Sequence, residues 1–408
     1  MILRMSSRTL VHVSLFMSFM ATSSLNAASF SEDKEFLKKH TELIVLSDRS
    51  GMSQVAVAPA WQGRVMTSTS GGDFGLSYGW INRDLIASGK LQPHINVFGG
   101  EDRFWLGPEG GQFSIFFAKG AQFELNDWQT PPAIDTLRYA PSKVSRSQVT
   151  FGAAFTLTNY SGTQFDLKVK RQVRLLTTSG VKAALGVGRA EAVQVVAFET
   201  VNRITNAGRN PWIHETGLLS VWILGMFNPS PATTIVVPIK SGPESALGSR
   251  LTSDYFGAVP PDRLVVRDAA VFFSGDGKFR SKIGISPRRS RAILGSYDAA
   301  NRVLTLVKFT QPEGVSDYVN SLWKLQDSPY AGDAANSYND GPATPGAKPL
   351  GPFYELESSS PAAALRPGQS LAHVHRTIHL SGDNESLDKV ARAHLGVSIQ
   401  EIQSALPK

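Results

Sequence analysis

The chain has 408 residues, 42% of them hydrophobic, and a formal net charge of +7 at pH 7. A chain of this length and composition can bury a large core, which excludes disorder as its main state. Its 36 glycines and 23 prolines, with many short runs of Val, Ile, Phe and Thr, predict frequent turns and a mostly β protein.

The first 27 residues have the pattern of a secretory signal peptide. Arg4 and Arg8 make the start positive, residues 10–20 are apolar, and small residues precede Ala27, where we expect cleavage. The alternative interpretation is a buried N-terminal strand. The apolar run is shorter than the roughly 20 residues of a membrane span, and the lack of cysteine excludes a lipoprotein anchor. We therefore expect a periplasmic or secreted protein without a stable membrane span.

The mature chain is predicted to be only mildly basic. Without Arg4 and Arg8 the formal charge falls from +7 to +5. The densest basic cluster is Arg288, Arg289 and Arg291, and no long Lys/Arg tract or aromatic-interleaved basic stripe follows it. We therefore expect no nucleic-acid partner, whereas an acidic polysaccharide is compatible with the charge.

From residue 54 onward, short apolar strands alternate with turns. A hairpin is predicted over residues 147–176, with its turn at residues 159–162. Further strands are predicted at residues 54–58, 63–67, 193–205, 218–227, 265–273, 278–285, 291–297 and 303–309. Because no βαβ alternation appears, a parallel sheet is disfavoured. The predicted fold is all-β, a large antiparallel β-sandwich that covers residues 28–381.

Two polar segments interrupt this rhythm. The first, residues 96–117, holds four charged residues among glycines and aromatics, namely Glu101, Asp102, Arg103 and Glu109. The second, residues 327–349, is rich in Gly and Pro and contains Asp333, Asn336, Asn339 and Asp340. It is predicted to be a loop, either an ordinary surface loop with Asx-turns or a functional loop that closes over a pocket. Its two tyrosines favour the pocket.

Residues 351–380 are predicted to form two strands joined by a long turn. Because side chains alternate along a strand, Glu355 and Glu357 share one face of the first strand. By the same alternation, His373 and His375 share one face of the second strand. If the two strands pair, carboxylates and imidazoles converge on one site.

The last 27 residues, 382–408, are predicted to form a helical tail. Apolar residues recur there at helical spacing, at Leu387, Val390, Ala391 and Leu395. Either Asp383 or Ser386 is the expected helix N-cap.

The C-terminal segment resembles a known family. Its run Leu356-Glu357-Ser358-Ser359, followed by Leu-Arg-Pro-Gly-Gln at residues 365–369 and a last strand at 373–377, is similar to the pattern of aldose 1-epimerases, the galactose mutarotases. Asp102-Arg103-Phe104, with Gly-Gly-Gln-Phe at residues 110–113, resembles an earlier family segment whose arginine binds the sugar. The resemblance implies a mutarotase-like sandwich from a secreted bacterial branch, with Glu357 as the catalytic base and Arg103 as a sugar ligand.

The general acid remains open. Where the family has Asn-His-Ser-Tyr-Phe-Asn-Leu with an acid histidine, this chain has Thr-Gly-Leu-Leu-Ser-Val-Trp at residues 216–222, and His214 is offset. Opening a sugar ring at the anomeric carbon needs an acid as well as a base. The candidates for the acid are His214, His373, His375 and Glu355.

The sequence thus predicts an exported carbohydrate-active protein of the aldose 1-epimerase type, an isomerase. The predicted catalytic residues are Glu357, Glu355, His375 and His373, and the predicted substrate-binding residues are Arg103, Asp102, Asn336, Asn339, Asp340 and His214. No cofactor is expected, although the Glu355/Glu357 and His373/His375 pairs together suit a divalent metal. The alternatives are a glycosidase or lyase that uses the two glutamates or a metal, and a sugar-binding protein without activity.

Overall fold

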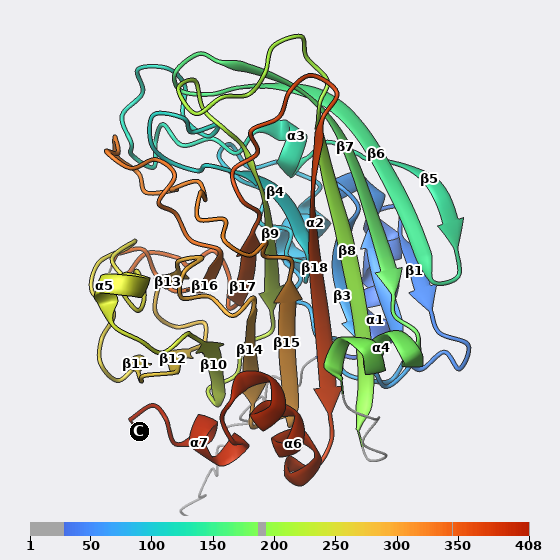
Figure 1. Ribbon diagram of the computed structural model, residues 1–408. Helices are drawn as coiled ribbons and strands as arrows, with labels where there is room; N and C mark the ends of the chain where they lie inside the picture. The colour runs from blue at the N-terminus through green and yellow to red at the C-terminus, as the bar shows by residue number, and fades with distance from the viewer. Residues whose placement is uncertain (1–27, 187–192, 345, 408) are drawn as a thin grey trace, which may run out of the picture.

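The computed structural model describes residues 28–186, 193–344 and 346–407, so the predicted signal peptide lies outside the described residues. A ten-stranded sheet and a five-stranded sheet enclose apolar cores between them, and a three-stranded sheet lies alongside (Figure 1). Every paired strand in the described part of the chain runs antiparallel to its neighbour. The predicted all-β antiparallel sandwich is confirmed.

We call the two main layers the large sheet and the small sheet. The large sheet has the order β11 (Leu264–Val266), β12 (Ala270–Ser274), β10 (Thr233–Pro238), β14 (Ile293–Asp298), β15 (Val303–Phe309), β18 (Ser370–Ser381), β8 (Gln194–Asn206), β7 (Gln164–Leu175), β6 (Gln148–Thr158) and β5 (Ala140–Ser145). The small sheet has the order β13 (Ser281–Ile285), β16 (Ala335–Asn339), β17 (Tyr354–Ser359), β9 (Ser220–Phe227) and β4 (Arg103–Gly107).

The remaining elements flank these sheets. The third sheet contains β1 (Ile44–Ser47), β2 (Gln54–Ala58) and β3 (Arg64–Thr69). The helices are α1 (Phe30–His40), the 3-10 turn η1 (Pro59–Trp61), α2 (Arg83–Ser88), α3 (Pro132–Asp135), α4 (Thr178–Leu185), α5 (Glu244–Leu247), α6 (Asn384–Leu395) and α7 (Ile399–Gln403). None of the helices in these described ranges is long and apolar enough to cross a membrane.

Buried and exposed side chains alternate along the long strands of the large sheet. Along β7 the buried and exposed positions alternate for almost the whole strand, with Val169 and Val173 buried and Lys168 and Lys170 exposed. The predicted hairpin is β6 and β7, which pair from Gln148 to Thr158 without a register shift. One face of each long strand therefore looks into the sandwich and the other faces outward.

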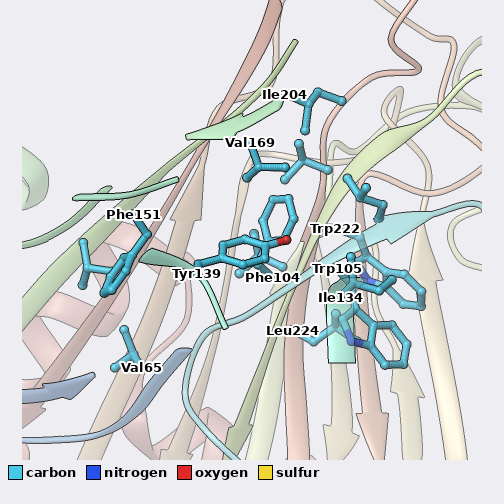
Figure 2. Packing of buried hydrophobic residues seen from close by; sticks show 14 of the residues in the cluster. Val65, Phe104, Trp105, Ile134, Tyr139, Phe151, Val169, Ile204, Trp222 and Leu224 are labelled. Atoms are coloured by element: carbon cyan, nitrogen blue, oxygen red, sulfur yellow. The ribbon is translucent and has the colours of Figure 1, made fainter. Parts of the chain in front are cut away.

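The main core lies between the inner faces of the two sheets. Phe104 of the small sheet packs edge to face on Tyr139, with 6.0 Å between the ring centroids, and Val169 and Ile204 of the large sheet belong to the same cluster (Figure 2). Trp105, next to Phe104 in β4, points to the opposite side of the small sheet. The inner face of the small sheet, with Phe104, therefore packs on the core, whereas Trp105 lies on its outer face.

The C-terminal helices cover one end of the large sheet's outer face (Figure 1). The predicted tail helix is α6, its N-cap is Asp383, and its four predicted apolar residues are all buried. They join α7 and α4 in a cluster with Ile378 and Leu380 of β18. The tail is thus packed against the sandwich rather than separate from it.

Two predictions of local structure are wrong. Residues 265–273 are not one strand but part of the hairpin β11–β12. The predicted loop at residues 327–349 contains β16, which pairs with β13 on one side and β17 on the other. A polar sequence with weak strand propensity becomes a central strand here because both neighbours supply backbone partners.

Candidate functional site

The two strands that were expected to pair lie in different sheets. β17, which carries Glu355 and Glu357, pairs with β16 and β9 in the small sheet. β18, which carries His373 and His375, pairs with β15 and β8 in the large sheet. The predicted convergence of carboxylates and imidazoles is therefore wrong, because the glutamates are on the outer face of β17 and the histidines face its inner side.

The two histidines are part of the interior between the sheets. Ser358, on the inner face of β17, hydrogen-bonds Nε2 of His373 and Nδ1 of His375, both at 2.8 Å. Both rings are fully buried, and burial lowers the pKa of His373 to about 3 and that of His375 to about 4. Neutral rings bound to a hydroxyl fit a structural network better than the predicted catalytic role.

The predicted metal-ligand set is not assembled. The glutamate pair and the histidine pair lie on opposite sides of the small sheet, so they cannot share one ion. Within the described ranges, no group of three or more His, Asp or Glu side chains is arranged to hold a metal.

Glu357 lies on the outer face of the small sheet and is fully buried. Its Oε2 atom accepts hydrogen bonds from Nε1 of Trp222 at 2.8 Å and from Nζ of Lys282 at 3.1 Å. The ammonium of Lys282 also lies 4.7 Å from the centre of the Trp222 ring. Among the described residues, no hydrogen-bond donor reaches the other oxygen, Oε1. The carboxylate is thus fixed through one oxygen only.

Burial alone would lower the pKa of Lys282, but the glutamates around it raise the pKa above its usual value. Glu357 has the largest effect among them, and Glu109 and Glu355 add to it. Burial also raises the pKa of Glu109. Lys282 is thus the cation at the centre of a buried acidic group, which favours its charged form.

Glu355 is bound to Arg103 on the same face. The guanidinium Nη2 of Arg103 lies 3.0 Å from Oε1 of Glu355, and the guanidinium stacks 4.2 Å from the centre of the Trp105 ring. Burial raises the pKa of Glu355 to about 8, with Arg103 opposing the rise and Glu357 adding to it. The pKa of Glu355 is therefore well above that of an ordinary exposed glutamate.

A small cleft lies beside Trp222 and Lys282, the two residues that bind Glu357. Its enclosed part holds about 20 Å³, roughly the room that one water molecule needs, and the wider hollow of about 280 Å³ includes open solvent. Its lining consists of Trp222, Tyr255, Lys282, Val319, Ser321, Asp333, Asn336 and Ser359. Glu357 is not part of this lining, and its carboxylate is connected to the cleft through Trp222 and Lys282, which bind it.

The cleft has its own titratable pair, Asp333 and Tyr255. The Tyr255 hydroxyl donates a hydrogen bond to Oδ2 of Asp333, and Nδ2 of Asn336 donates to the same hydroxyl at 3.2 Å. Burial raises the pKa of Asp333 to about 6. A Cβ atom at Gly284 would collide with both Asp333 and Tyr255, so only glycine lets this pair approach β13.

The predicted substrate-binding residues are scattered. Asn336 lines the cleft and Arg103 lies near it beside Glu355. Asp340 instead accepts hydrogen bonds from the Tyr338 hydroxyl and the Gly351 amide, and Asn339 ties down the turn at Asp276 and Gly277. Exposed His214 pairs with Asp317 at 3.1 Å.

Asp102 is also away from the cleft. It faces the large sheet, where its Oδ1 atom lies 2.7 Å from Nη2 of Arg171, and both side chains are fully buried. Asp102 and Arg103 are consecutive residues at a strand start, so their side chains point to opposite sides. Its predicted place beside Arg103 in a sugar site is therefore wrong.

Three residues of the site had no role in the prediction from sequence. Lys282 and Tyr255 come from segments that look like an ordinary strand and an ordinary loop, and Trp222 appears only at the end of the segment 216–222, which lacks the family's histidine. The strand predicted at residues 278–285 contains Lys282, but nothing in the sequence indicates which strand lies beside it. The pairing of β13 with β16 supplies that information.

The fold and the cleft define a class of protein: a large antiparallel β-sandwich with a small, polar, titratable cleft on the outer face of one sheet. The chain belongs to a protein family of unknown function, DUF6786, whose model matches residues 28–406. No curated protein matches the sequence.

Several solved structures are similar to this chain. They include the Slr1438 protein of Synechocystis sp. PCC 6803, with 12% identity, a TM-score of 0.49 and coverage of 84% of this chain and 96% of that one. A galactose mutarotase-like protein of Lactobacillus casei ATCC 334 has 12% identity, a TM-score of 0.45 and coverage of 83% and 100%. A galactose mutarotase related enzyme of Lactobacillus acidophilus has 9% identity, a TM-score of 0.44 and coverage of 84% and 97%.

Proposed function

We propose that this protein is an exported, sugar-acting isomerase of the aldose 1-epimerase type, with Glu357 as its base. The observation that carries the proposal is how Glu357 is held. Two residues that line the cleft, Trp222 and Lys282, bind its Oε2 atom, and Oε1 has no partner among the described residues. A fixed carboxylate with one free oxygen is suited to take a proton from a hydroxyl. Export rests on the N-terminal sequence pattern.

Asp333 is the acid that we propose. It lines the cleft, whereas Glu355 is bound to Arg103, and the two buried histidines lie on the far side of the small sheet. The hydrogen bond from Tyr255 fixes the Asp333 carboxyl group in the cleft wall. With its raised pKa, Asp333 keeps a proton at mildly acidic pH and can donate it to a ring oxygen.

The pH dependence of turnover is expected to report the pKa of Asp333. Because the acid must be protonated, turnover should fall as the pH rises above about 6, the pKa of Asp333. Asp333→Asn should remove this limb together with most of the activity. A limb near pH 8 instead, lost in Glu355→Gln, would assign the acid to Glu355, whose pKa is about 8.

Glu357→Gln is expected to reduce catalysed anomer exchange by about 10²- to 10⁴-fold, because the amide cannot accept the hydroxyl proton. The measurement is NMR exchange spectroscopy on a panel of free aldoses, with the rate in buffer subtracted. The matched control is Glu313→Gln, the same change at an exposed carboxylate, which should keep the wild-type rate. Equal rates in both variants, with exchange above buffer, would remove Glu357 from the mechanism.

A sugar-binding protein without turnover is the second candidate. The observation in its favour is that Glu357 is fully buried behind Trp222 and Lys282, so a substrate hydroxyl meets those two residues first. Binding of an aldose by calorimetry with no exchange above buffer would favour this candidate. Release of a sugar from a glycoside, lost in Glu357→Gln, would favour hydrolysis instead.

A further inference from the structure

A basic face lies on the outer side of the large sheet, on the opposite side of the sandwich from the cleft. It consists of six cationic side chains on four neighbouring strands: Lys168, Lys170 and Arg174 of β7, Arg203 of β8, Arg376 of β18 and Lys308 of β15. The strands run in the order β15, β18, β8 and β7, so these side chains form one continuous surface.

The same outer face has two different halves. Towards one end, the sheet is covered by α4, α6 and α7 (Figure 1). Apolar residues of these helices cluster with Leu306, Ile378 and Leu380. Beyond those helices the outward positions become basic, and Lys168, Lys170 and Arg203 are exposed. The change from apolar to basic therefore occurs where the helical cover ends.

The strand register places like charges opposite each other twice on this face. Lys170 of β7 is the direct partner of Arg203 of β8, and Lys308 of β15 is the direct partner of Arg376 of β18. Like charges directly opposite across a sheet are destabilising. Burial lowers the pKa of Lys308, and Arg376 lowers it further. Lys308 also donates a hydrogen bond to the Ala184 carbonyl at 2.8 Å, so the pair that an anionic ligand would relieve most is Lys170 and Arg203.

Two carboxylates on the face offset only part of its charge. Glu199 lies between the cations and forms ion pairs with Arg174 and with Arg376. Asp166, at the start of β7, accepts a hydrogen bond from Thr156. No ion pair involves Lys168, Lys170 or Arg203 in the part of the chain that the structure describes. The part of the face that these three residues form therefore has an uncompensated positive charge.

We propose that the basic face is a docking surface for an acidic polysaccharide. Cations spaced by roughly 5 Å across strands and 7 Å along them suit a ligand that repeats its negative charge. The outward neighbours Gln172, Thr205 and Ser370 offer hydrogen-bonding groups for sugar hydroxyls. The exposed outward positions of β7, β8 and β18 carry no aromatic side chain to stack on bases and no large apolar side chain to enter a lipid surface.

The test compares two triple variants of the full mature chain. Lys168→Ala/Lys170→Ala/Arg203→Ala removes three charges from the basic face, and the control Lys39→Ala/Lys90→Ala/Lys119→Ala removes three exposed charges elsewhere. Binding to alginate, a uronic acid polymer, is measured by calorimetry at rising salt, with neutral dextran alongside. We expect salt-sensitive alginate binding, no dextran binding on this face, and affinity at least about tenfold weaker in the first variant only.

Other outcomes would overturn the proposal. An equal loss in the control variant would mean that net charge alone attracts the polymer. Single-stranded DNA or anionic vesicles that bind more tightly than alginate, with the same dependence on the three residues, would assign the face to a different partner. No alginate binding at low salt by folded wild type would also refute it. Anomer exchange should be the same in both variants, so failure here leaves the cleft proposal standing.

Discussion

Arg171→Met is expected to lower the free energy of unfolding by about 3–5 kcal/mol, since it leaves the buried Asp102 carboxylate without its partner. Arg171 also donates hydrogen bonds from Nε to the Gly63 carbonyl at 3.1 Å and from Nη1 to Asn202. The Asp102 contact joins the large sheet to the segment that leads into β4, and the Gly63 contact joins it to the segment that leads into β3. The measurement is urea unfolding followed by tryptophan fluorescence and circular dichroism.

The control for this prediction is Arg203→Met, the same substitution at an exposed arginine on the next strand, which should change stability by less than about 0.5 kcal/mol. The double variant Arg171→Met/Asp102→Leu should be more stable than Arg171→Met alone, because no buried charge is then left unpaired. A loss below about 1 kcal/mol in Arg171→Met would mean that this ion pair does not join the sheets.

Local alternation explains what the sequence could predict about the site. The shared face of Glu355 and Glu357 depends only on the two-residue period of a strand, and so does the shared face of His373 and His375. The same rule separates Asp102 from Arg103, so placing both in one sugar site conflicted with the sequence itself. Faces within a strand are local information and can be read without knowing the fold.

The order of strands in a sheet, in contrast, cannot be read from the local sequence. Nothing near Glu357 in the sequence indicates that β17 lies between β16 and β9, so Trp222 and Lys282 could not be named as its partners. Tyr255 is 78 residues from Asp333, to which it donates its hydrogen bond. The cleft therefore became visible only when the sheet order was known, whereas the sandwich itself followed from turn spacing and composition.

The buried histidine pair should make the protein less stable in acid. The pKa values of about 3 for His373 and about 4 for His375 lie below the usual value of 6.5, so the unfolded chain binds more protons than the folded chain between these limits. Stability is then unaffected above pH 6.5 and falls as the pH drops towards 4, by about 1.4 kcal/mol per pH unit for each histidine.

Buried acids act in the opposite direction, so the histidine effect must be measured as a difference. Raised pKa values at Asp333 and Glu355 make the folded chain bind more protons than the unfolded chain, and this adds stability on acidification. The variant His373→Asn/His375→Asn removes only the histidine contribution. Its stability relative to wild type should therefore improve steadily as the pH falls from 6.5 to 4.

Unfolding in urea at half-unit pH steps checks this expectation, with His40→Asn as a control at an exposed histidine. At pH 7 the double variant is expected to be less stable than wild type, since asparagine fills less of the space around Ser358. The loss should shrink by up to about 2.7 kcal/mol per pH unit and then reverse, because only wild type must protonate two buried rings on unfolding. Parallel stability curves for the variant and wild type would show that the two rings accept protons in the folded interior, and that the interior between the sheets admits water at acid pH.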